Sequence, residues 1–492
     1  MRCLPRRPAF RRRSGRAGFG VPEECRHAIL RPRRVSSPDD SYLSASERRS
    51  PSCSRRGRLS VRSRAILGAR PARSRGKCDA TPPRVAAIWI IGPVPPSAMP
   101  SEPPAARGPA SSPESALRKK LQMKKSKNVL VVLYSLRAEG TPKLTLSIIQ
   151  SWRDYGVDAT VLVLTRMQNE LESEFIRNNI SIEYADISIS SRYLAIKIAL
   201  KTMQSCLKNR SVAVVSMLFG WHLFINIGAR LVGVRKCIAH VGNASEAKNI
   251  NWKFKALVAL ARPVTTRLVC CTDYVRRSVL ANFWLNESEL ITIPNGIDPK
   301  LFKSPGPALN RDLNVGMIGT LERHKDQATL IRSIVYLQDL GGESRRKPKL
   351  FLAGEGTQNL RLRSLVNELG LNEEVVFLGS VKDVPQFLCK LQVFAFSTTS
   401  EEGQGIALIE AMAARVPIVA TDVGACREVL DGGRCGLMVH EQNPEALANA
   451  IWRMATDEDL ASRIVDAALE RVNSVYNIKN TAHDYLKQIM NA

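Results

Sequence analysis

The sequence lacks the long apolar runs and paired cysteines that would place it among membrane-spanning or disulfide-stabilised proteins. No apolar run reaches the roughly 18–20 residues that a membrane-spanning helix needs. The longest apolar run in the first quarter of the chain, Val85 to Val94, is too short and is followed by prolines. The eleven cysteines show neither Cys-x-x-Cys spacing nor a histidine pattern typical of zinc sites. The sequence therefore predicts a soluble or peripheral protein with packed thiols, in a reducing compartment.

Acidic residues are scarce in the first quarter of the chain. Residues 1–127 contain 30 Lys and Arg but only 8 Asp and Glu, and this segment accounts for most of the formal net charge of +27. It also contains 17 of the 27 prolines and few of the apolar residues that offset chain entropy. We therefore expect 1–127 to be a disordered basic extension, and 128–492 to form two domains of ordinary size.

Three interpretations of the basic segment stay open. Its Arg- and Ser-rich, acid-poor composition is typical of an organelle transit peptide, and basic tracts also attract nucleic-acid phosphates without sequence preference. The interpretation we favour is a natural start at Met123, because Met123 to Lys127 leads straight into the first predicted strand. We expect no nucleic-acid partner for the folded part.

Predicted strands and helices alternate from Asn128 onward. The β-branched run at 129–133 is typical of a buried parallel strand, and a glycine-containing turn precedes apolar residues at helical spacing over 144–152. The same unit recurs, with further strands predicted at 159–164, 212–216, 268–271, 315–319, 349–353, 375–378, 393–396 and 418–420, and further helices at 169–178, 327–337, 359–369 and 405–415.

This alternation predicts an α/β fold with two Rossmann-like, doubly wound parallel-sheet domains that face a cleft. A Pro- and Gly-containing segment near residue 305 indicates a linker between them. We expect an N-terminal domain at 128–303, a linker at 304–312, a C-terminal domain at 313–475 and a C-terminal helix at 476–492. In such sheets, ligands bind at the carboxyl ends of the strands.

Two carboxylates stand out in TTSEEGQGIALIEAMAARVPIVATDVG, residues 398–424. Glu402 precedes a predicted helix, and Glu410 lies on it among apolar residues, where a lone carboxylate costs several kcal/mol unless protein groups or ligand hydroxyls donate to it. Gly403 and Gly405 leave backbone N–H groups open at the helix start, which suits a diphosphate. A plain turn with Glu402 as helix cap fits the spacing equally well.

The segment resembles the acidic E-x7-E signature of retaining glycosyltransferases of family 4, which have the GT-B fold. Similar segments occur at 292–298 (TIPNGID), 350–358 (LFLAGEGTQ), 375–381 (VVFLGSV) and 421–439, and the likeness extends over about 128–480. It implies a glycosyltransferase of hexosyltransferase type (EC 2.4) that transfers a sugar from a nucleotide-sugar to a saccharide or lipid-linked acceptor. Bacterial exopolysaccharide and lipopolysaccharide enzymes are similar, which implies a role in surface polysaccharide biosynthesis.

The resemblance also implies roles for single residues. Glu410 would hold the ribose hydroxyls of the donor, Glu402 would contact hydroxyls of the transferred sugar, and the backbone at Gly405 and Ile406 would meet the diphosphate. The N-terminal domain would receive the acceptor and the C-terminal domain the nucleotide-sugar. The acceptor hydroxyl would attack from the face that the nucleotide leaves.

A phosphate clamp of Arg, four residues and then Lys is usual in this family after the first strand of the second domain. Here GMIGTLERHKDQATLI has Lys325 at the Lys position but Thr320 where Arg is usual. Lys325 still supplies a point cation at a helix start, with Arg323 or His324 as further candidates; a solvated basic turn is the alternative. Gly354, in LFLAGEGTQ, is expected in the same donor site.

Two residues of the first domain are further candidates. Gly140, followed by Thr141, occupies a loop where the family often has a Gly-Gly turn against the donor or acceptor, although a simple tight turn fits equally well. His240 ends an apolar strand where similar proteins carry a cleft histidine close to the donor sugar; a satisfied core histidine is the alternative. We expect His222 to be structural.

Metal and cofactor sites are not expected. Asp457-Glu458-Asp459 has a D-x-D form, but a helix start with an acidic first turn has the same pattern. The resemblance implies no bound metal and no cofactor, since the nucleotide-sugar is a co-substrate.

Two segments, 192–210 and 252–267, mix basic with aromatic and aliphatic residues at helical spacing, as in helices that rest on anionic membranes. We therefore expect a cytoplasmic protein, peripheral on the inner face of the cytoplasmic membrane; core-facing helices with a solvated basic edge are the alternative. Two other functions stay open, a GT-B nucleotide-sugar epimerase and a catalytically weak nucleotide-sugar-binding protein.

Overall fold

The computed structural model describes residues 127–167, 169–188, 190–245, 250–302, 313–341 and 347–491. The predicted disordered extension, the start at Met123 and the predicted linker 304–312 lie outside these residues, except that Lys127 already begins the first strand. Within the described ranges, no helix is both long and apolar enough to cross a membrane.

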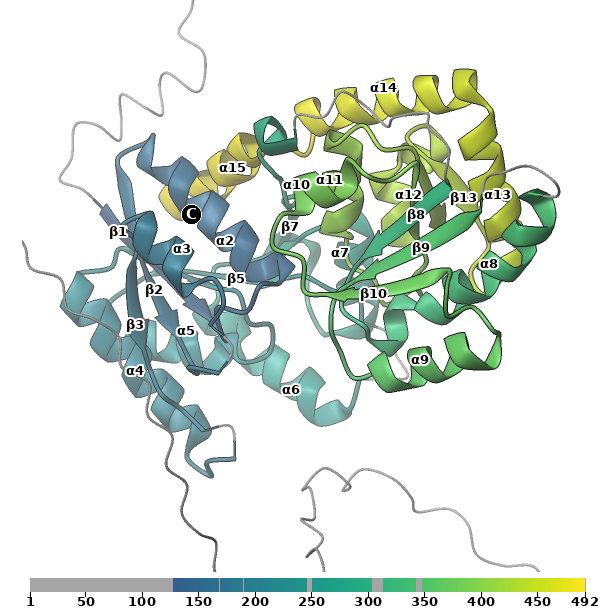
Figure 1. Ribbon diagram of the computed structural model, residues 1–492. Coiled ribbons are helices and arrows are strands. Elements are labelled where there is room, and N and C mark those ends of the chain that lie inside the picture. The colour runs from purple at the N-terminus through teal and green to yellow at the C-terminus, as the bar shows by residue number, and fades with distance from the viewer. Residues whose placement is uncertain are drawn as a thin grey trace, which may run out of the picture. The chain divides into compact units, whose positions relative to one another are not determined.

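The first sheet has seven strands in the order β3-β2-β1-β4-β5-β6-β7, and every described pairing in it is parallel (Figure 1). Its elements are β1 (Lys127–Leu133), α2 (Gly140–Arg153), β2 (Val157–Val163), α3 (Glu172–Arg177), β3 (Ser181–Tyr184), α4 (Leu194–Asn209), β4 (Ala213–Ser216), α5 (His222–Leu231), β5 (Lys236–Val241), α6 (Trp252–Leu260), β6 (Arg267–Cys270), α7 (Asp273–Asn282) and β7 (Leu290–Thr292). Val129 to Leu133 are all buried because helices cover both faces of a parallel sheet.

The second sheet has six parallel strands in the order β10-β9-β8-β11-β12-β13. Its elements are β8 (Leu313–Ile318), α8 (Gln327–Gly341), β9 (Pro348–Ala353), α9 (Asn359–Glu368), β10 (Val375–Gly379), α10 (Val384–Leu388), β11 (Val393–Phe396), α11 (Ile406–Ala413), β12 (Ile418–Thr421), α12 (Gly424–Val429), β13 (Leu437–Val439), α13 (Pro444–Thr456) and α14 (Glu458–Ser474). We call residues 127–302 the first half and 313–474 the second half. The predicted α/β fold with two parallel sheets is confirmed.

The last helix, α15 (Ile478–Asn491), follows the second half in sequence but packs on the first. The indole nitrogen of Trp152 in α2 donates to the carbonyl of Ala482 at 2.9 Å. Tyr485, Leu486 and Ile489 are buried in the same apolar cluster as the inward side chains of β1 and α2. The chain therefore crosses from one half to the other twice.

Cysteine side chains in the described ranges are unpaired. All of these except Cys389 are buried. They pack as small apolar side chains in the cores of the two halves.

Candidate active site

Loops at the carboxyl ends of two neighbouring strands, β8 and β11, bring Lys325 and Glu402 together. The Lys325 ammonium donates to the Glu402 carboxylate, and the two side chains are only 14% and 6% exposed. The carboxyl ends of parallel strands meet at one sheet edge, so residues 77 positions apart become neighbours. This buried ion pair is the centre of the candidate site.

Glu402 is held in its charged form. Burial alone would raise its pKa, but the ion pair with Lys325, the nearby His324 and the N–H of Gly403 together lower the pKa below its ordinary value. The Gly403 N–H donates to Glu402 at 3.1 Å, and the Thr398 hydroxyl lies 3.3 Å from Glu402 while donating to the His324 carbonyl at 2.9 Å. The carboxylate is therefore fixed in orientation before any ligand arrives.

Lys325 lies over an aromatic ring as well as beside Glu402. Its Nζ is 5.3 Å from the centroid of the Phe396 ring, at the end of β11. Lys325, which was predicted to bind the donor phosphate, is thus neutralised by Glu402, which was predicted to bind the transferred sugar. The sequence had assigned the two residues to different parts of a donor and had not paired them.

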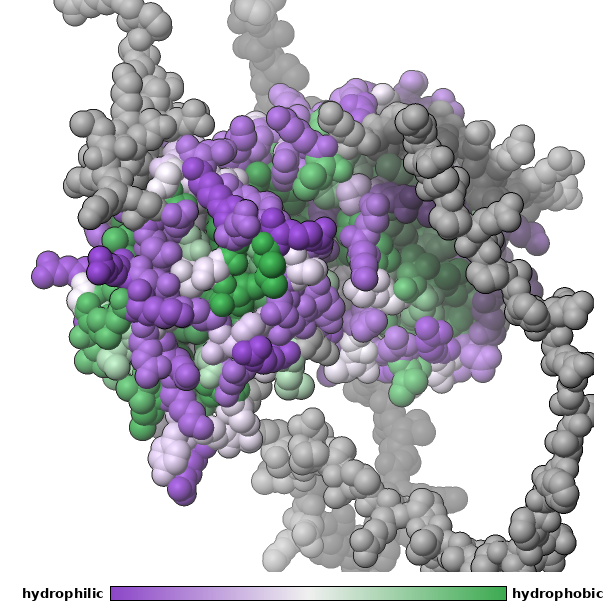
Figure 2. Space-filling model, turned by 60° about the vertical axis from the view of Figure 1, so that its left-hand side comes forward, coloured by the Kyte–Doolittle hydropathy of each residue, from purple (hydrophilic) through white to green (hydrophobic). Residues whose placement is uncertain are grey.

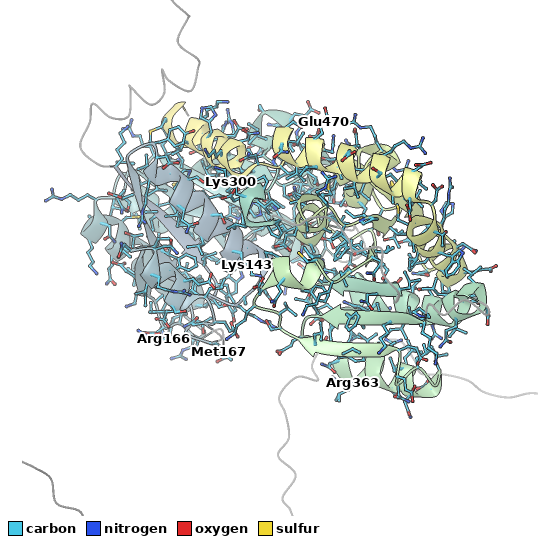
Figure 3. The ribbon with its side chains drawn as sticks, turned by 45° about the horizontal axis from the view of Figure 1, so that its top comes forward. Lys143, Arg166, Met167, Lys300, Arg363 and Glu470 are labelled. Atoms are coloured by element: carbon cyan, nitrogen blue, oxygen red, sulfur yellow. The ribbon has the colours of Figure 1, made fainter. Side chains whose placement is uncertain are left out.

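Glu410 has the opposite electrostatics. It lies on α11, and burial raises its pKa to about 7, with only the charge of Lys143 opposing the shift. Lys143 comes from α2 in the first half (Figure 3). No described residue forms a hydrogen bond with the Glu410 carboxylate, and the residue is partly exposed, so solvent or a ligand hydroxyl can reach it.

The start of α11 is approached closely by first-half backbone. Gly405 caps the helix in the left-handed region, at φ 72°. A Cβ on Gly403 would lie 1.7 Å from the carbonyl oxygen of Gly242, and one on Gly140 would lie 3.1 Å from the Ile406 side chain. Gly403 therefore leaves no room for a side chain, whereas a side chain at Gly140 would make a tight contact with the movable end of Ile406.

The other residues predicted for the donor phosphate site, Thr320, Gly354 and Arg323, lie in different surroundings. The carbonyl of Thr320 accepts from the Gln327 amide at 2.9 Å, and a Cβ on Gly354 would lie 2.0 Å from the carbonyl oxygen of Gly319. Arg323 is exposed and lines a hollow beside α8 and α9, together with His324. Lys325, Glu402 and Glu410 are not among the described residues that line this hollow.

His240 lies in the core. Its ring is 3% exposed, its Nδ1 is 2.9 Å from the Tyr485 hydroxyl of α15, and burial lowers its pKa to about 4. This geometry matches the alternative of a satisfied core histidine, and its role toward a donor sugar stays a prediction. His222 accepts from the Gly220 N–H at 3.0 Å and stacks on Phe219, as expected of a structural residue.

The D-x-D sequence begins α14. Asp457 accepts from the Leu460 N–H at 3.0 Å, which is the helix-cap geometry that the sequence predicted.

Two first-half residues that touch the Glu402 loop were missed by the sequence reasoning. Thr272 and Tyr274 follow strand β6 and donate to carbonyls of the loop between β11 and α11. The signal was available, since a Thr-Asp-Tyr sequence after a buried strand lies at the carboxyl edge, where ligands and partner loops meet.

Comparison with known proteins finds a family match over part of the chain. Residues 302–471 match the family model described as glycosyl transferases group 1. The matched region spans most of the second half and includes Lys325, Glu402 and Glu410.

Curated relatives match over less than their full length. An N-acetylgalactosamine-N,N'-diacetylbacillosaminyl-diphospho-undecaprenol 4-alpha-N-acetylgalactosaminyltransferase of Campylobacter jejuni is 27% identical over 240 residues, 48% of this chain and 63% of that protein. A phosphatidyl-myo-inositol mannosyltransferase of Mycobacterium leprae is 32% identical over 202 residues, 40% of this chain and 53% of that protein. The chain spans about three fifths of the length of the curated relatives it matches.

Solved structures support the fold. Anabaena HepE, crystallised with UDP and glucose, superposes with a TM-score of 0.64 at 18% identity, covering 74% of this chain and 99% of that one. WaaG, described as a glycosyltransferase involved in lipopolysaccharide biosynthesis, gives 0.58 at 14% identity, with 74% and 100% covered. The predicted GT-B architecture is confirmed.

Proposed function

We propose that this protein is a retaining glycosyltransferase of family 4 that transfers a hexose from a nucleotide-sugar to a saccharide or lipid-linked acceptor in surface polysaccharide assembly. The observation that carries the proposal is a pair of carboxylates, one before α11 and one within it: Glu402 is buried and paired with Lys325, while Glu410 forms no hydrogen bond with a described residue. The group 1 match and the names of the relatives support it.

In this proposal, Glu410 binds the donor ribose. Two ribose hydroxyls donate to its carboxylate, and such donation favours the charged form against the burial that raises its pKa to about 7. Nucleotide binding therefore lowers the pKa of Glu410, and binding should strengthen as the pH rises through about 7.

Lys325 and the start of α11 serve the diphosphate. As the bond between the anomeric carbon and the phosphate oxygen breaks, negative charge grows on the leaving diphosphate, and a cation held in place stabilises it. The acceptor oxygen bonds to the anomeric carbon on the same face, and its proton passes to the leaving phosphate. The proposal needs no metal, because Lys325 and the helix start supply positive charge.

A thermal-shift experiment on the full chain tests donor binding. UDP, GDP, ADP and CMP are added separately, and a nucleotide at about 100 times its Kd should stabilise by about 2.7 kcal/mol, a shift of about 2–4 °C. Glu410→Ala should abolish the shift. Glu470→Ala, on the exposed side of α14 (Figure 3), is the matched control and should keep it. A wild type that no nucleotide stabilises, alone or as nucleotide-sugar, would contradict the proposal.

The retaining mechanism has its own test. NMR of the sugar that is transferred, or released to water, should show the anomeric configuration of the donor in the first product formed. Inverted product would exclude family 4.

A second candidate, a donor-binding protein with little transfer, is favoured by one observation. Thr320 stands where the family usually has the clamp arginine, and Lys325 is already paired with Glu402. Nucleotide binding without detectable release of nucleotide from any nucleotide-sugar would support this candidate.

We also propose that α4 rests on an anionic membrane. Ile196, Leu200 and Leu207 are 45–59% exposed on this helix, which carries Lys197, Lys201 and Lys208 and no acidic residue. The left-hand side of Figure 1, where α4 lies, comes forward in Figure 2, and apolar residues gather there in patches between hydrophilic ones. Exposed apolar side chains flanked by lysines match the chemistry of an anionic lipid surface.

The second basic helix, α6, has the same combination of exposed apolar and basic side chains. Trp252 is 70% exposed and Leu260 is 67% exposed at its two ends, and Lys253 and Lys255 lie between them. Tryptophan is enriched at membrane interfaces because one end of its ring system is apolar and the other polar.

Co-sedimentation of the full chain with phosphatidylglycerol-containing vesicles tests the membrane proposal. Leu200→Glu should weaken binding severalfold, whereas Leu360→Glu, on an 83% exposed site of α9, should leave it unchanged. The basic residues 1–127 are present in every variant, so the comparison isolates α4. Equal binding of the two variants would contradict the proposal.

A further inference from the structure

The loop that carries Glu402 is held from the first half. The Tyr274 hydroxyl donates to the carbonyl of Ser400 at 2.8 Å, and the Thr272 hydroxyl donates to the carbonyl of Gly403 at 2.8 Å. These two carbonyls lie on either side of Glu402 in the sequence. The backbone of the loop is therefore fixed at both ends by side chains that come from the start of α7.

A third contact holds the end of the same loop. The Gln404 side chain accepts from the N–H of Asn295 at 2.9 Å and donates to its carbonyl at 3.0 Å. Both residues are buried, at 2% and 5% exposure. Because a buried amide must find partners, Gln404 ties the loop to the segment that follows β7.

The second half fixes the start of α7 in return. The Glu428 carboxylate of α12 accepts from the N–H groups of Asp273 and Tyr274, each at 2.8 Å. These are donors of the first helical turn, which have no partner within the helix and favour a negative charge. A Cβ on Gly424 would lie 2.1 Å from the Tyr274 ring, so glycine is needed for this approach.

The Thr272 hydroxyl has two functions at once. Its oxygen accepts from the Val275 N–H at 3.1 Å, which caps α7, while its single proton goes to Gly403. Thr272 is 1% exposed, so water does not compete for either bond. The position of α7 and the conformation of the Glu402 loop are thereby coupled through one side chain.

We propose that Tyr274 and Thr272 are positioning residues for Glu402, and that the loop from Thr399 to Gly405 takes its working conformation only while the two halves are in contact. The proposal rests on the proposed function in assigning Glu402 to the transferred sugar. The positioning role goes beyond the proposed function because the proposed donor site lies on the second half but depends on hydrogen bonds from the first half. The observed bonds of both residues go to loop carbonyls, so in this proposal each acts through the loop.

Hydrogen–deuterium exchange of the full chain without ligand tests the positioning role independently of donor chemistry. Tyr274→Phe keeps the ring and removes the bond to Ser400, so amides of 399–405 should exchange about fivefold faster, the factor expected for one hydrogen bond. Tyr336→Phe, a 41% exposed site on α8, is the matched control and should exchange like wild type.

The conservative pair at position 272 sharpens the test. Thr272→Ser keeps the hydroxyl and should exchange like wild type, whereas Thr272→Val should speed exchange in the loop as well as at the start of α7. Unchanged exchange of 399–405 in both Tyr274→Phe and Thr272→Val would overturn the proposal.

A kinetic readout separates positioning from donor binding. UDP-glucose, UDP-galactose, UDP-N-acetylglucosamine and GDP-mannose serve as probes, and nucleotide release is followed. With the probe that wild type uses, Tyr274→Phe should lower kcat about fivefold while the affinity for the free nucleotide changes less than about twofold. If wild type binds no nucleotide, the proposed function fails, and the exchange experiment still decides the positioning role.

Discussion

Glu402, which is buried, and Glu410, which is partly buried, belong to one motif, yet the protein treats their charges in opposite ways. Glu402 receives a cation and a hydrogen bond from the Gly403 N–H, and its pKa falls below the ordinary value. Glu410 receives no hydrogen bond from a described residue, and its pKa rises to about 7. A buried carboxylate that the fold has already satisfied can act as a fixed part of a site, whereas one that is left unsatisfied is available to a ligand.

Removing the cation from the satisfied carboxylate should have the largest effect. Lys325→Met leaves Glu402 charged and unpaired inside the protein, which costs about 3–5 kcal/mol for a buried pair. Urea denaturation should show this loss, and donor turnover should fall with it.

Two controls bound that result. Lys300→Met, at an exposed position labelled in Figure 3, should change stability by less than about 0.5 kcal/mol. The double variant with Glu402→Gln should recover much of the loss, because no unpaired charge remains. A Lys325→Met variant as stable as wild type would show that the pair is not buried in solution.

Neutralising Glu410, which has no hydrogen-bond partner among the described residues, should increase the stability of the protein at high pH. The folded-state pKa of Glu410 is about 7, above the ordinary value of about 4.3, so wild type loses stability as the pH rises between these two values. Glu410→Gln cannot lose a proton and should be more stable than wild type at pH 8, on the order of 1–3 kcal/mol, but not at pH 4.5.

Urea denaturation at the two pH values measures the difference. The same variant should lose the nucleotide-induced thermal shift, so stability and binding move in opposite directions. A variant less stable than wild type at pH 8 would place Glu410 with Glu402, as a carboxylate that the fold itself satisfies.

The smallest expected effect comes from removing the positive charge of Lys143, which opposes the rise in the pKa of Glu410. Among the described residues, Lys143 is the one whose charge lowers the pKa of Glu410 against the effect of burial. Lys143→Ala should therefore raise the pH midpoint of nucleotide binding by less than about one unit, as expected for a charge pair near the protein surface. Binding titrations between pH 6 and 8 measure it, with Lys300→Ala as control. A midpoint that falls would mean that Lys143 does not face Glu410 when the nucleotide is bound.

Local sequence patterns predicted those strands that are covered by helices on both faces of the sheet. Buried apolar runs such as 129–133 and 393–396 lie within observed strands. Strand β3 was missed because its residues are only partly buried and it lies at a sheet edge, and β13 because three residues are too few to show a period.

The site was predictable residue by residue but not pair by pair. Glu402, Glu410 and Lys325 were found from their motifs, whereas the ion pair joins residues 77 positions apart. The partner of His240 lies 245 positions away, on a helix whose docking no local period specifies. Such contacts depend on how the halves and α15 pack, which is a property of the tertiary structure.

The return of α15 to the first half has a consequence for the order in which the protein is made. The core between β1 and α2 includes Tyr485, Leu486 and Ile489, which are synthesised only after the whole second half. The second half has its own apolar core and can close before α15 is synthesised. The half that is translated first is therefore completed last, and until then its exposed apolar surface is a natural substrate for chaperones.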